Sequence, residues 1–458
     1  RRQEVPMSVR NVELSPRPDR TKSRKVSRRT LSRRGLLRGG AAGGLMLGVP
    51  ALASGCGGSG SGGGGGKTTV KMWTWYGEQR EQWPQLVKEF ESSHPNIKIQ
   101  NRVFGDTDSY LQSLQASVSG DKPPDIYAPH VLAIEYGKNG IALDLKDALG
   151  ADFLKGFFPS TNAEYSDANK QYALGWMAQT FGIFYNPQIL EKAGVGGPPE
   201  TWEDLVSAAA AIRSKTGLIP CSLSNNPGPS GLDFLLPLIT QVTDNPQLVL
   251  DLDMQRKDAS WDSQPVIESL AMVKHLVDEK VFAPGINGVT GEQASSAFYT
   301  GKAAMYYSGS WEPQGFLQSA PKAFLDVYQV AETPAWKSGA KHWCANQAGA
   351  GLAVANGDNA DAAVEFIKWL YEPKRYAKVM NDSHSMPSTI AAAEGITDPF
   401  MKKMTSWLVK GNGCPHILFG KGSSDAASNA LSAVVEGSAT PEKGAADIQS
   451  AVKKAQAR

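Results

Sequence analysis

Few residues in this chain stand at the spacings that catalysis or metal binding requires. The sequence contains no phosphate-binding GxxxxGK[ST] loop, no GxGxxG after a predicted strand, no GxSxG and no HExxH. Cys221, Cys344 and Cys414 lack the CxxC spacing typical of zinc sites, and at most one disulfide can join two of them. Carboxylates are plentiful, but none is singled out as a general acid or base. We therefore expect no metal, no cofactor and no catalysis, with a glycoside hydrolase whose two carboxylates lie far apart in sequence as the alternative.

The fourth cysteine, Cys56, lies in a context that suggests covalent lipid attachment. The run Ala53-Ser54-Gly55-Cys56 resembles a lipobox, in which the cysteine is diacylated and becomes the mature N-terminus. Two acyl chains are enough for stable membrane anchoring. Upstream, residues 32–38 pair two arginines with a short Gly/Ala/Leu run, as in twin-arginine export signals. We therefore expect residues 1–55 to be a signal peptide and the protein to be a lipoprotein on the outer face of the cell membrane. A basic arm that binds nucleic acid or acidic lipid is the alternative.

The net charge of +2 is distributed very unevenly along the 458 residues. Residues 1–55 carry 13 Lys and Arg against 3 Asp and Glu, whereas the remainder carries 34 against 42, a net charge of −8. An acidic body would be repelled by phosphate backbones, which argues against a nucleic-acid partner. Residues 56–66 are almost all glycine and predict a flexible tether. The remaining length of about 390 residues exceeds what one hydrophobic core usually supports, so two lobes are expected.

Strand-like and helix-like segments alternate along this body. Strands are expected at 68–75, 97–99 and 125–128, with helices at 82–93 and 110–118 between them. The later segments are helices at 202–214, 264–279, 360–371 and 440–457 and a strand at 303–307. The alternation predicts the α/β class with a mostly parallel sheet.

Several short motifs follow one another in the body. They are Tyr172-Ala173-Leu174-Gly175-Trp176, Phe184-Tyr185-Asn186, Thr201-Trp202-Glu203-Asp204-Leu205, Gly301-Lys302-Ala303-Ala304-Met305 with Gly309-Ser310-Trp311, and Glu365-Phe366-Ile367-Lys368-Trp369-Leu370. Together they resemble the family 1 extracellular solute-binding proteins, the substrate receptors of carbohydrate ABC importers. The resemblance covers roughly residues 67–455 and implies the periplasmic-binding-protein-like fold (type II), in which two lobes are hinged around a central cleft.

The resemblance also implies how the chain is divided and what it contacts. Lobe 1 is expected to comprise 67–179 and 349–388, and lobe 2 to comprise 180–348 and 389–458, with crossings near 180, 344–349 and 386–390. The expected partners are an uncharged sugar or oligosaccharide, the transmembrane subunits of an ABC permease, and the membrane through the lipid anchor; the protein is expected to be a monomer. A sensory receptor with the same fold is a further alternative.

Ten cleft residues are implied by the same resemblance. They are Tyr76, Glu78, His130, Trp176, Gln179, Asn225, Asp233, Trp311, Glu312 and Asn346. Trp311 follows glycine and serine at a predicted strand end, where an aromatic ring could stack on the C–H face of a sugar. The neutral groups of Gln179, Asn225 and Asn346 suggest an uncharged ligand.

Two aromatic pairs require a choice between core and cleft. By the period of two along a strand, Trp75 is expected in the core and Tyr76 in the cleft. Tyr306 and Tyr307 are adjacent, as in some related receptors that bind ferric ion. Neighbours on a strand point to opposite faces, so we expect at most one of them to reach the cleft and no iron site.

Overall fold

A computed structural model describes residues 67–226 and 228–457. The predicted signal peptide, the candidate lipidation site Cys56 and the predicted glycine tether lie outside the described residues.

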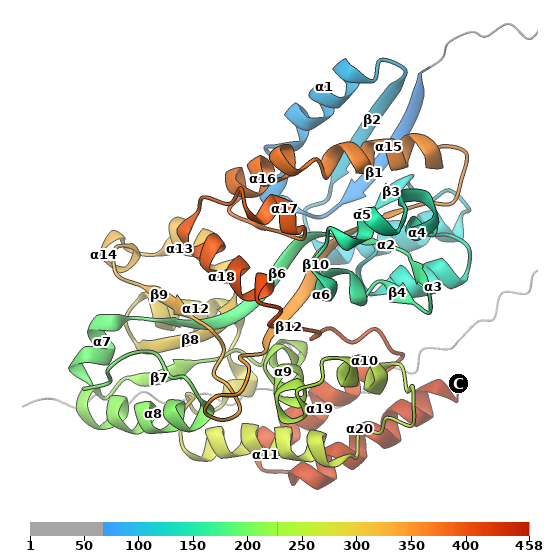
Figure 1. The fold of residues 1–458 in the computed structure, drawn as a ribbon. Coiled ribbons are helices and arrows are strands. Elements are labelled where there is room, and N and C mark those ends of the chain that lie inside the picture. The colour runs from blue at the N-terminus through green and yellow to red at the C-terminus, as the bar shows by residue number, and fades with distance from the viewer. Residues whose placement is uncertain (1–66, 227, 458) are drawn as a thin grey trace, which may run out of the picture. The chain divides into compact units, whose positions relative to one another are not determined.

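One mixed sheet of ten strands runs through this body (Figure 1). Its main path is β2-β1-β3-β10-β6-β8-β7, and β9 and β11 pair with β6 while β12 pairs with β10. The strands are β1 (Thr68–Thr74), β2 (Ile97–Val103), β3 (Ile126–Tyr127), β6 (Leu174–Tyr185), β7 (Ile219–Ser222), β8 (Ala303–Gly309), β9 (Gln329–Ala331), β10 (Cys344–Val354), β11 (Met386–Pro387) and β12 (Gly413–Cys414). A separate hairpin joins β4 (Ser166–Asp167) to β5 (Lys170–Gln171).

The α/β class is confirmed, but the sheet is less parallel than its sequence pattern predicts. β1 is parallel to both β2 and β3, and β7 is parallel to β8. Between these two groups lie the long strands β6 and β10, which are antiparallel to each other and to β8 and β3 respectively. The strand–helix alternation detects the parallel groups, whereas the direction of β6 and β10 is decided by long-range pairing.

Helices cover both ends of the sheet. In the first part of the chain they are α1 (Trp83–Ser93), α2 (Thr107–Ser119), α3 (Ala133–Lys138), α4 (Leu145–Leu149), α5 (Ala151–Lys155), α6 (Pro159–Ala163), α7 (Pro187–Lys192), α8 (Trp202–Thr216), α9 (Leu232–Thr243), α10 (Gln247–Asp253) and α11 (Gln264–Asp278). They continue as α12 (Gly291–Tyr299), α13 (Glu312–Ser319), α14 (Lys322–Leu325), α15 (Ala360–Leu370), α16 (Pro373–Asp382), α17 (Ile390–Ala393), α18 (Pro399–Val409), α19 (Ser423–Glu436) and α20 (Pro441–Gln456).

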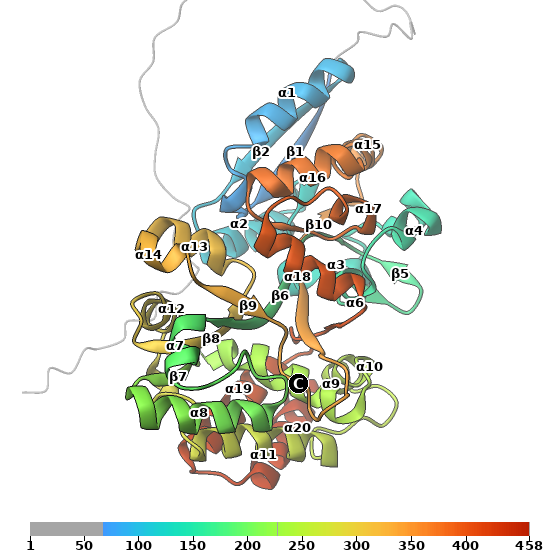
Figure 2. The same cartoon turned by 60° about the vertical axis from the view of Figure 1, so that its left-hand side comes forward.

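Helices far apart in sequence meet at each end of the sheet. Phe90 of α1 packs edge-on against Phe366 of α15, with ring centroids 4.7 Å apart. At the other end α19 and α20 lie beside α11 in both views (Figures 1 and 2). The start of α8 is confirmed where the sequence predicts it, because Thr201 and Asp204 form a capping box.

Buried apolar side chains gather into two cores. The first is centred on residues such as Val70, Ile126, Leu352 and Phe366, and also takes in Phe316 of α13. The second is built around residues of β7, α8, α9, α11, α19 and α20. The two cores do not coincide with the two expected lobes, because the first core contains Phe316 and Tyr328 of the expected lobe 2. The division into two lobes stays a prediction.

Membership of the two cores changes several times along the chain. In β6, Ala178 belongs to the first core and Phe181 to the second, and Cys344 and Ala345 at the start of β10 are divided in the same way. After α18 it changes once more, between Leu408 of the first core and Leu418 of the second. The crossings expected near 180, 344–349 and 386–390 stay predictions.

Candidate functional site

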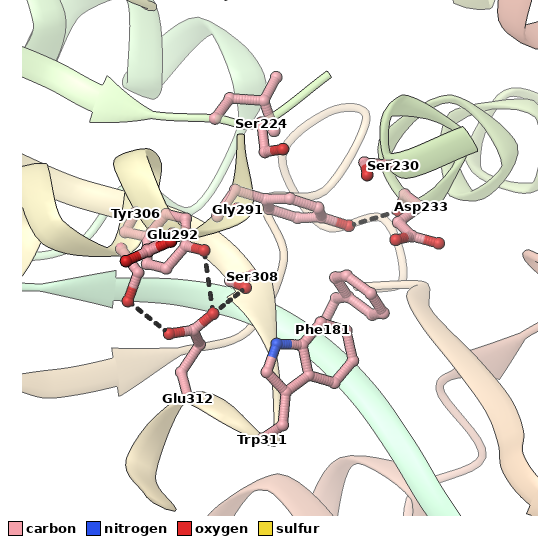
Figure 3. Close-up of a pocket in the computed structure, with 13 residues that line it drawn as sticks. Phe181, Ser224, Ser230, Asp233, Gly291, Glu292, Tyr306, Ser308, Trp311 and Glu312 are labelled. Atoms are coloured by element: carbon pink, nitrogen blue, oxygen red, sulfur yellow. Dashed lines mark hydrogen bonds between the residues drawn. The ribbon is translucent and has the colours of Figure 1, made fainter. Parts of the chain in front are cut away.

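A pocket of about 390 Å³ opens where the parallel strands β7 and β8 end (Figure 3). Because carboxyl ends of parallel strands lie at one edge of a sheet, the loops that follow them converge there. The lining residues come from β6, the loop after β7, η3 (Gly228–Gly231), α9, α12, β8 and α13; they are Phe181, Leu223, Ser224, Ser230, Asp233, Gly291, Glu292, Ser295, Tyr306, Tyr307, Ser308, Trp311 and Glu312.

Trp311 forms an apolar wall of this pocket. It is 38% exposed, and the other tryptophan, tyrosine and phenylalanine residues that the structure describes are all less exposed. Its ring lies edge-on to that of Phe181 at 5.0 Å between centroids (Figure 3). Gly309 makes this position possible, because a Cβ there would lie 2.2 Å from the indole. A flat apolar face is thus held open at the pocket.

Glu312 is the most heavily hydrogen-bonded carboxylate of the pocket. Its Oε2 accepts a bond from Ser295 Oγ at 2.8 Å, and its Oε1 accepts from Tyr306 Oη and Ser308 Oγ, each at 2.9 Å (Figure 3). The side chain is buried, and burial raises the pKa of Glu312 above its ordinary value although the three hydroxyls oppose the shift. This network fixes the carboxylate beside the pocket.

Asp233 occupies the first turn of α9 on another side of the pocket. Its Oδ1 accepts from Nδ1 of His416 at 2.7 Å, and its backbone carbonyl accepts from Tyr307 Oη at 3.0 Å. The Asp233 side chain is 27% exposed, whereas that of His416 is fully buried. Asp233 is therefore held from behind while part of its carboxylate faces the pocket.

The charge of the pocket lining has one sign. Asp233, Glu292 and Glu312 contribute carboxylates, and no Lys or Arg occurs among the described lining residues. With the serine hydroxyls and aromatic rings, the lining can hydrogen-bond to hydroxyl groups and stack on apolar faces. A ligand that carries an anionic group would be repelled.

Of the ten residues expected in the cleft, Asp233, Trp311 and Glu312 are brought together at this pocket. Tyr76 instead lies in the core with 1% exposure, where its Oη donates to the Gly351 carbonyl at 2.6 Å. Trp75 is half-buried, so the expected order of these neighbours is reversed. The period of two itself holds, because Val70, Met72, Thr74 and Tyr76 are all buried, whereas Trp73 and Trp75 are only half-buried. The core face of β1 is therefore the face opposite to the one expected.

Trp176 is also placed in the core rather than at a cleft. It has no exposed surface, stacks on Trp83 with centroids 5.5 Å apart, and packs against Tyr376 at 4.9 Å. The sequence showed a tryptophan near a crossing but not that β6 is covered there by α1 and α16.

Two of the three amides expected to bind ligand, those of Asn346 and Asn225, donate hydrogen bonds within the protein. Asn346 is buried on β10 and donates from Nδ2 to the Gln179 carbonyl of β6 at 2.8 Å. Asn225 is 3% exposed and donates to Asn287 Oδ1 at 2.6 Å and to Ser432 Oγ at 3.3 Å. None of these amides is among the pocket-lining residues, so the inference of an uncharged ligand from them is not supported by their positions.

His130 and Glu78 lie away from the pocket, at the ends of β3 and β1. The His130 ring is edge-on to Trp75 at 5.6 Å, and burial lowers its pKa. His130 also has a left-handed backbone, with φ of 50°. Glu78 is half-buried in the 3₁₀ turn η1 (Gly77–Gln79). Neither residue lines the pocket described above.

Several lining residues were not expected from the sequence. Tyr306 and Tyr307 both line the pocket, although the alternation of a strand allowed only one. The Tyr306 hydroxyl donates to Glu312, and the Tyr307 hydroxyl donates to the Asp233 carbonyl at the start of α9, so each ring meets a different lining residue. In the sequence, the carboxylate of Glu312 six residues after Tyr306 could have indicated that Tyr306 lines the site. No sequence feature pointed to Glu292 as a lining residue.

The described residues include His, Cys, Asp and Glu side chains outside this pocket. In that part of the chain no cluster of three or more His, Cys, Asp or Glu side chains is arranged to hold a metal ion. Cys221, Cys344 and Cys414 are buried free thiols, and burial raises the pKa of Cys221 and of Cys344 to about 12. No helix between residues 67 and 457, as far as the structure describes them, has the length and hydropathy needed to cross a membrane.

Comparison of the sequence with known proteins assigns the chain to one family. A family model described as bacterial extracellular solute-binding protein matches residues 76–376. The arabinooligosaccharide-binding protein of Bacillus subtilis (strain 168) is 24% identical over 303 residues, which cover 64% of this chain and 67% of that protein.

Solved structures share the fold of the body. A family 1 extracellular solute-binding protein from Bifidobacterium longum subsp. infantis has a TM-score of 0.71 and 21% identity, over 85% of this chain and 100% of that one. A cyclic alpha-maltosyl-1,6-maltose binding protein from Arthrobacter globiformis has a TM-score of 0.71 and 18% identity, over 85% and 99% of the two chains. At such identities the likeness concerns the fold.

Proposed function

The chain belongs to the bacterial extracellular solute-binding proteins, and from that premise we propose that it captures a sugar or oligosaccharide and delivers it to an ABC permease. Members of this family bind solutes rather than transform them, so the chain is a binding protein and not an enzyme. The relatives named for arabinooligosaccharide and for a cyclic maltosyl-maltose support the choice of a sugar.

The observation that carries the proposal is the combination of Trp311 with fixed oxygen acceptors in one pocket. Sugars present C–H faces that stack on aromatic rings and hydroxyls that donate to carboxylates. Trp311 offers the exposed ring, and Glu312 and Asp233 offer carboxylates whose positions are held by neighbouring side chains. Apolar lining with a few oriented polar groups is the usual composition of a small-molecule site.

The ligand we propose is uncharged. The three carboxylates of the lining repel uronic acids and sugar phosphates, and no Lys or Arg among the described lining residues could compensate. The reason for an uncharged ligand therefore differs from the one suggested by sequence, because acidic groups rather than neutral amides surround the pocket.

Attachment to the membrane completes the proposal. A twin-arginine signal would export the chain, and a diacylated Cys56 would anchor the body through the glycine tether beside the permease. Replacing Cys56 by Ser should release the protein from membranes into the medium and abolish incorporation of labelled palmitate. Release of the unsubstituted protein would contradict the anchor without affecting sugar binding.

Sugar binding is tested by isothermal titration calorimetry on the purified protein. The panel comprises arabinotriose, maltotriose and a cyclic maltosyl-maltose, with trigalacturonic acid as the anionic counterpart. We expect one neutral sugar to bind, the uronic acid not to bind, and the bound sugar to be recovered unhydrolysed. Tight binding of trigalacturonic acid would refute the role of the acidic lining, and a panel without any binder would refute a sugar of these classes.

A further inference from the structure

His416 contacts the proposed site from a distant part of the chain. It lies in the segment 412–422 between α18 and α19, and its Nδ1 is 2.7 Å from Oδ1 of Asp233. A carboxylate accepts hydrogen bonds, so with Asp233 ionised the proton of this bond is on His416 Nδ1. The other carboxylate oxygen, Oδ2, has no hydrogen-bond partner among the described residues.

The bond to Asp233 is the one hydrogen bond that the His416 ring makes to the described residues. Its side chain is fully buried, and its Nε2 has no hydrogen-bond partner among the residues that the structure describes. A buried polar atom without a partner lowers stability. The ring also packs edge-on against Phe181, a pocket residue, at 5.1 Å between centroids. The fold thus retains a histidine where an apolar side chain would avoid an unpaired nitrogen.

The segment that carries His416 is fastened at a second point and joins the two cores. Asp253 accepts the backbone N–H groups of Phe419 at 2.6 Å and of Gly420 at 2.8 Å. Leu408, before the segment, belongs to the first core, and Leu418 belongs to the second. The position of His416 is therefore set by backbone bonds that do not involve the pocket.

We propose that His416 is a positioning residue that holds Oδ1 of Asp233, so that Oδ2 is presented to the sugar in a fixed orientation. This inference rests on the proposed function and deepens it. A carboxylate that is already oriented binds more tightly, because less side-chain freedom is lost when the ligand arrives. Since segment 412–422 passes between the cores, the same bond links occupation of the pocket to that segment.

A double-mutant cycle tests the proposal, with the sugar of the calorimetric panel that the unsubstituted protein binds most tightly. His416→Ala should weaken binding about tenfold, the usual order for a hydrogen bond to a charged group. In an Asp233→Ala background the same substitution should change affinity less than about twofold, because the residue through which it acts is absent. His416→Asn should restore most of the affinity, since its Nδ2 lies near the place of Nδ1, and His416→Gln should not.

Two further measurements separate positioning from a general structural role. Ser423→Ala is the matched control, because Ser423 Oγ donates to the Asp253 carbonyl at 3.3 Å and does not touch Asp233; it should lower the melting temperature and leave affinity unchanged. Nitrogen NMR of the imidazole should show the Nδ1–H tautomer for His416 and a changed signal in Asp233→Ala.

The outcomes are distinguishable. Equal loss of affinity from His416→Ala with and without Asp233, or equal loss from Ser423→Ala, overturns the positioning role while the proposed function stands. An imidazole signal that does not respond to Asp233→Ala overturns it as well. If the unsubstituted protein binds no sugar of the panel, the proposed function fails first, and the role of His416 in sugar binding fails with it.

Discussion

Replacing Trp311 by Ala is the most direct perturbation of the pocket. The ring contributes to the wall beside Phe181, and it is held there by close packing on Gly309 rather than by deep burial. Its removal should therefore act mainly on the ligand. A core tryptophan such as Trp176 would instead affect stability.

The expected magnitude follows from the exposed area. A tryptophan offers about 250 Å² of surface, so an exposed fraction of 38% leaves about 95 Å² for a sugar to cover. At about 25 cal/mol per Å², complete coverage would contribute about 2.4 kcal/mol, and coverage of half that area about 1.2 kcal/mol. Stacking adds about 0.5 to 1.5 kcal/mol. The loss should therefore be about 1.7 to 3.9 kcal/mol, or about 15- to 700-fold in Kd.

The assay is calorimetric titration with the sugar that the unsubstituted protein binds, together with thermal unfolding of each variant. Trp311→Phe should retain part of the affinity because a smaller ring can still stack. Gly309→Ala is a second test, since its Cβ would displace the indole without removing it. Unchanged affinity in Trp311→Ala, with a melting temperature lowered as for a core residue, would refute the assignment of Trp311 as the stacking surface.

Three further predictions concern neighbouring residues. Because burial raises the pKa of Glu312, the folded state binds the Glu312 proton more tightly than the unfolded state, and the contribution of Glu312 to stability falls as pH rises from about 4.5 through the raised pKa. The melting temperature of Glu312→Gln should therefore rise relative to that of the unsubstituted protein over this pH range. Parallel curves of melting temperature against pH would contradict this. Tyr76→Phe removes the bond to the Gly351 carbonyl and should lower the free energy of unfolding by about 0.5 to 1.5 kcal/mol, with Kd unchanged; a weaker Kd in calorimetry would return Tyr76 to the site. Gly231→Ala places a Cβ 2.1 Å from Asn225 Oδ1 and should lower the free energy of unfolding, measured in urea, by about 1 to 3 kcal/mol. It should also weaken sugar binding, because α9, which carries Asp233, begins at the next residue. A stable variant with normal affinity would show that the loop adjusts freely.

Local patterns in the sequence predicted ten of the helices and strands of the described chain and left the others unassigned. The helix at α8 follows from its capping box, and the strand at β1 follows from a short run of alternating apolar residues. The direction of β6 and β10 was not predicted, because antiparallel pairing between residues such as Gly351 and Gly175 joins parts of the chain far apart in sequence. The spacing of apolar residues within a short segment carries no information about such long-range contacts.

For the site, sequence alone identified the family resemblance and the residues that follow strand ends. Trp311, Glu312 and Asp233 were found in this way because their motifs are local. Tertiary packing could not be predicted: it places Tyr76 in the core, and it joins His416 to Asp233 across 183 residues. The physical reason is that residue type and spacing set the chemistry that a side chain can perform, whereas its access to a ligand depends on what the rest of the chain packs against it.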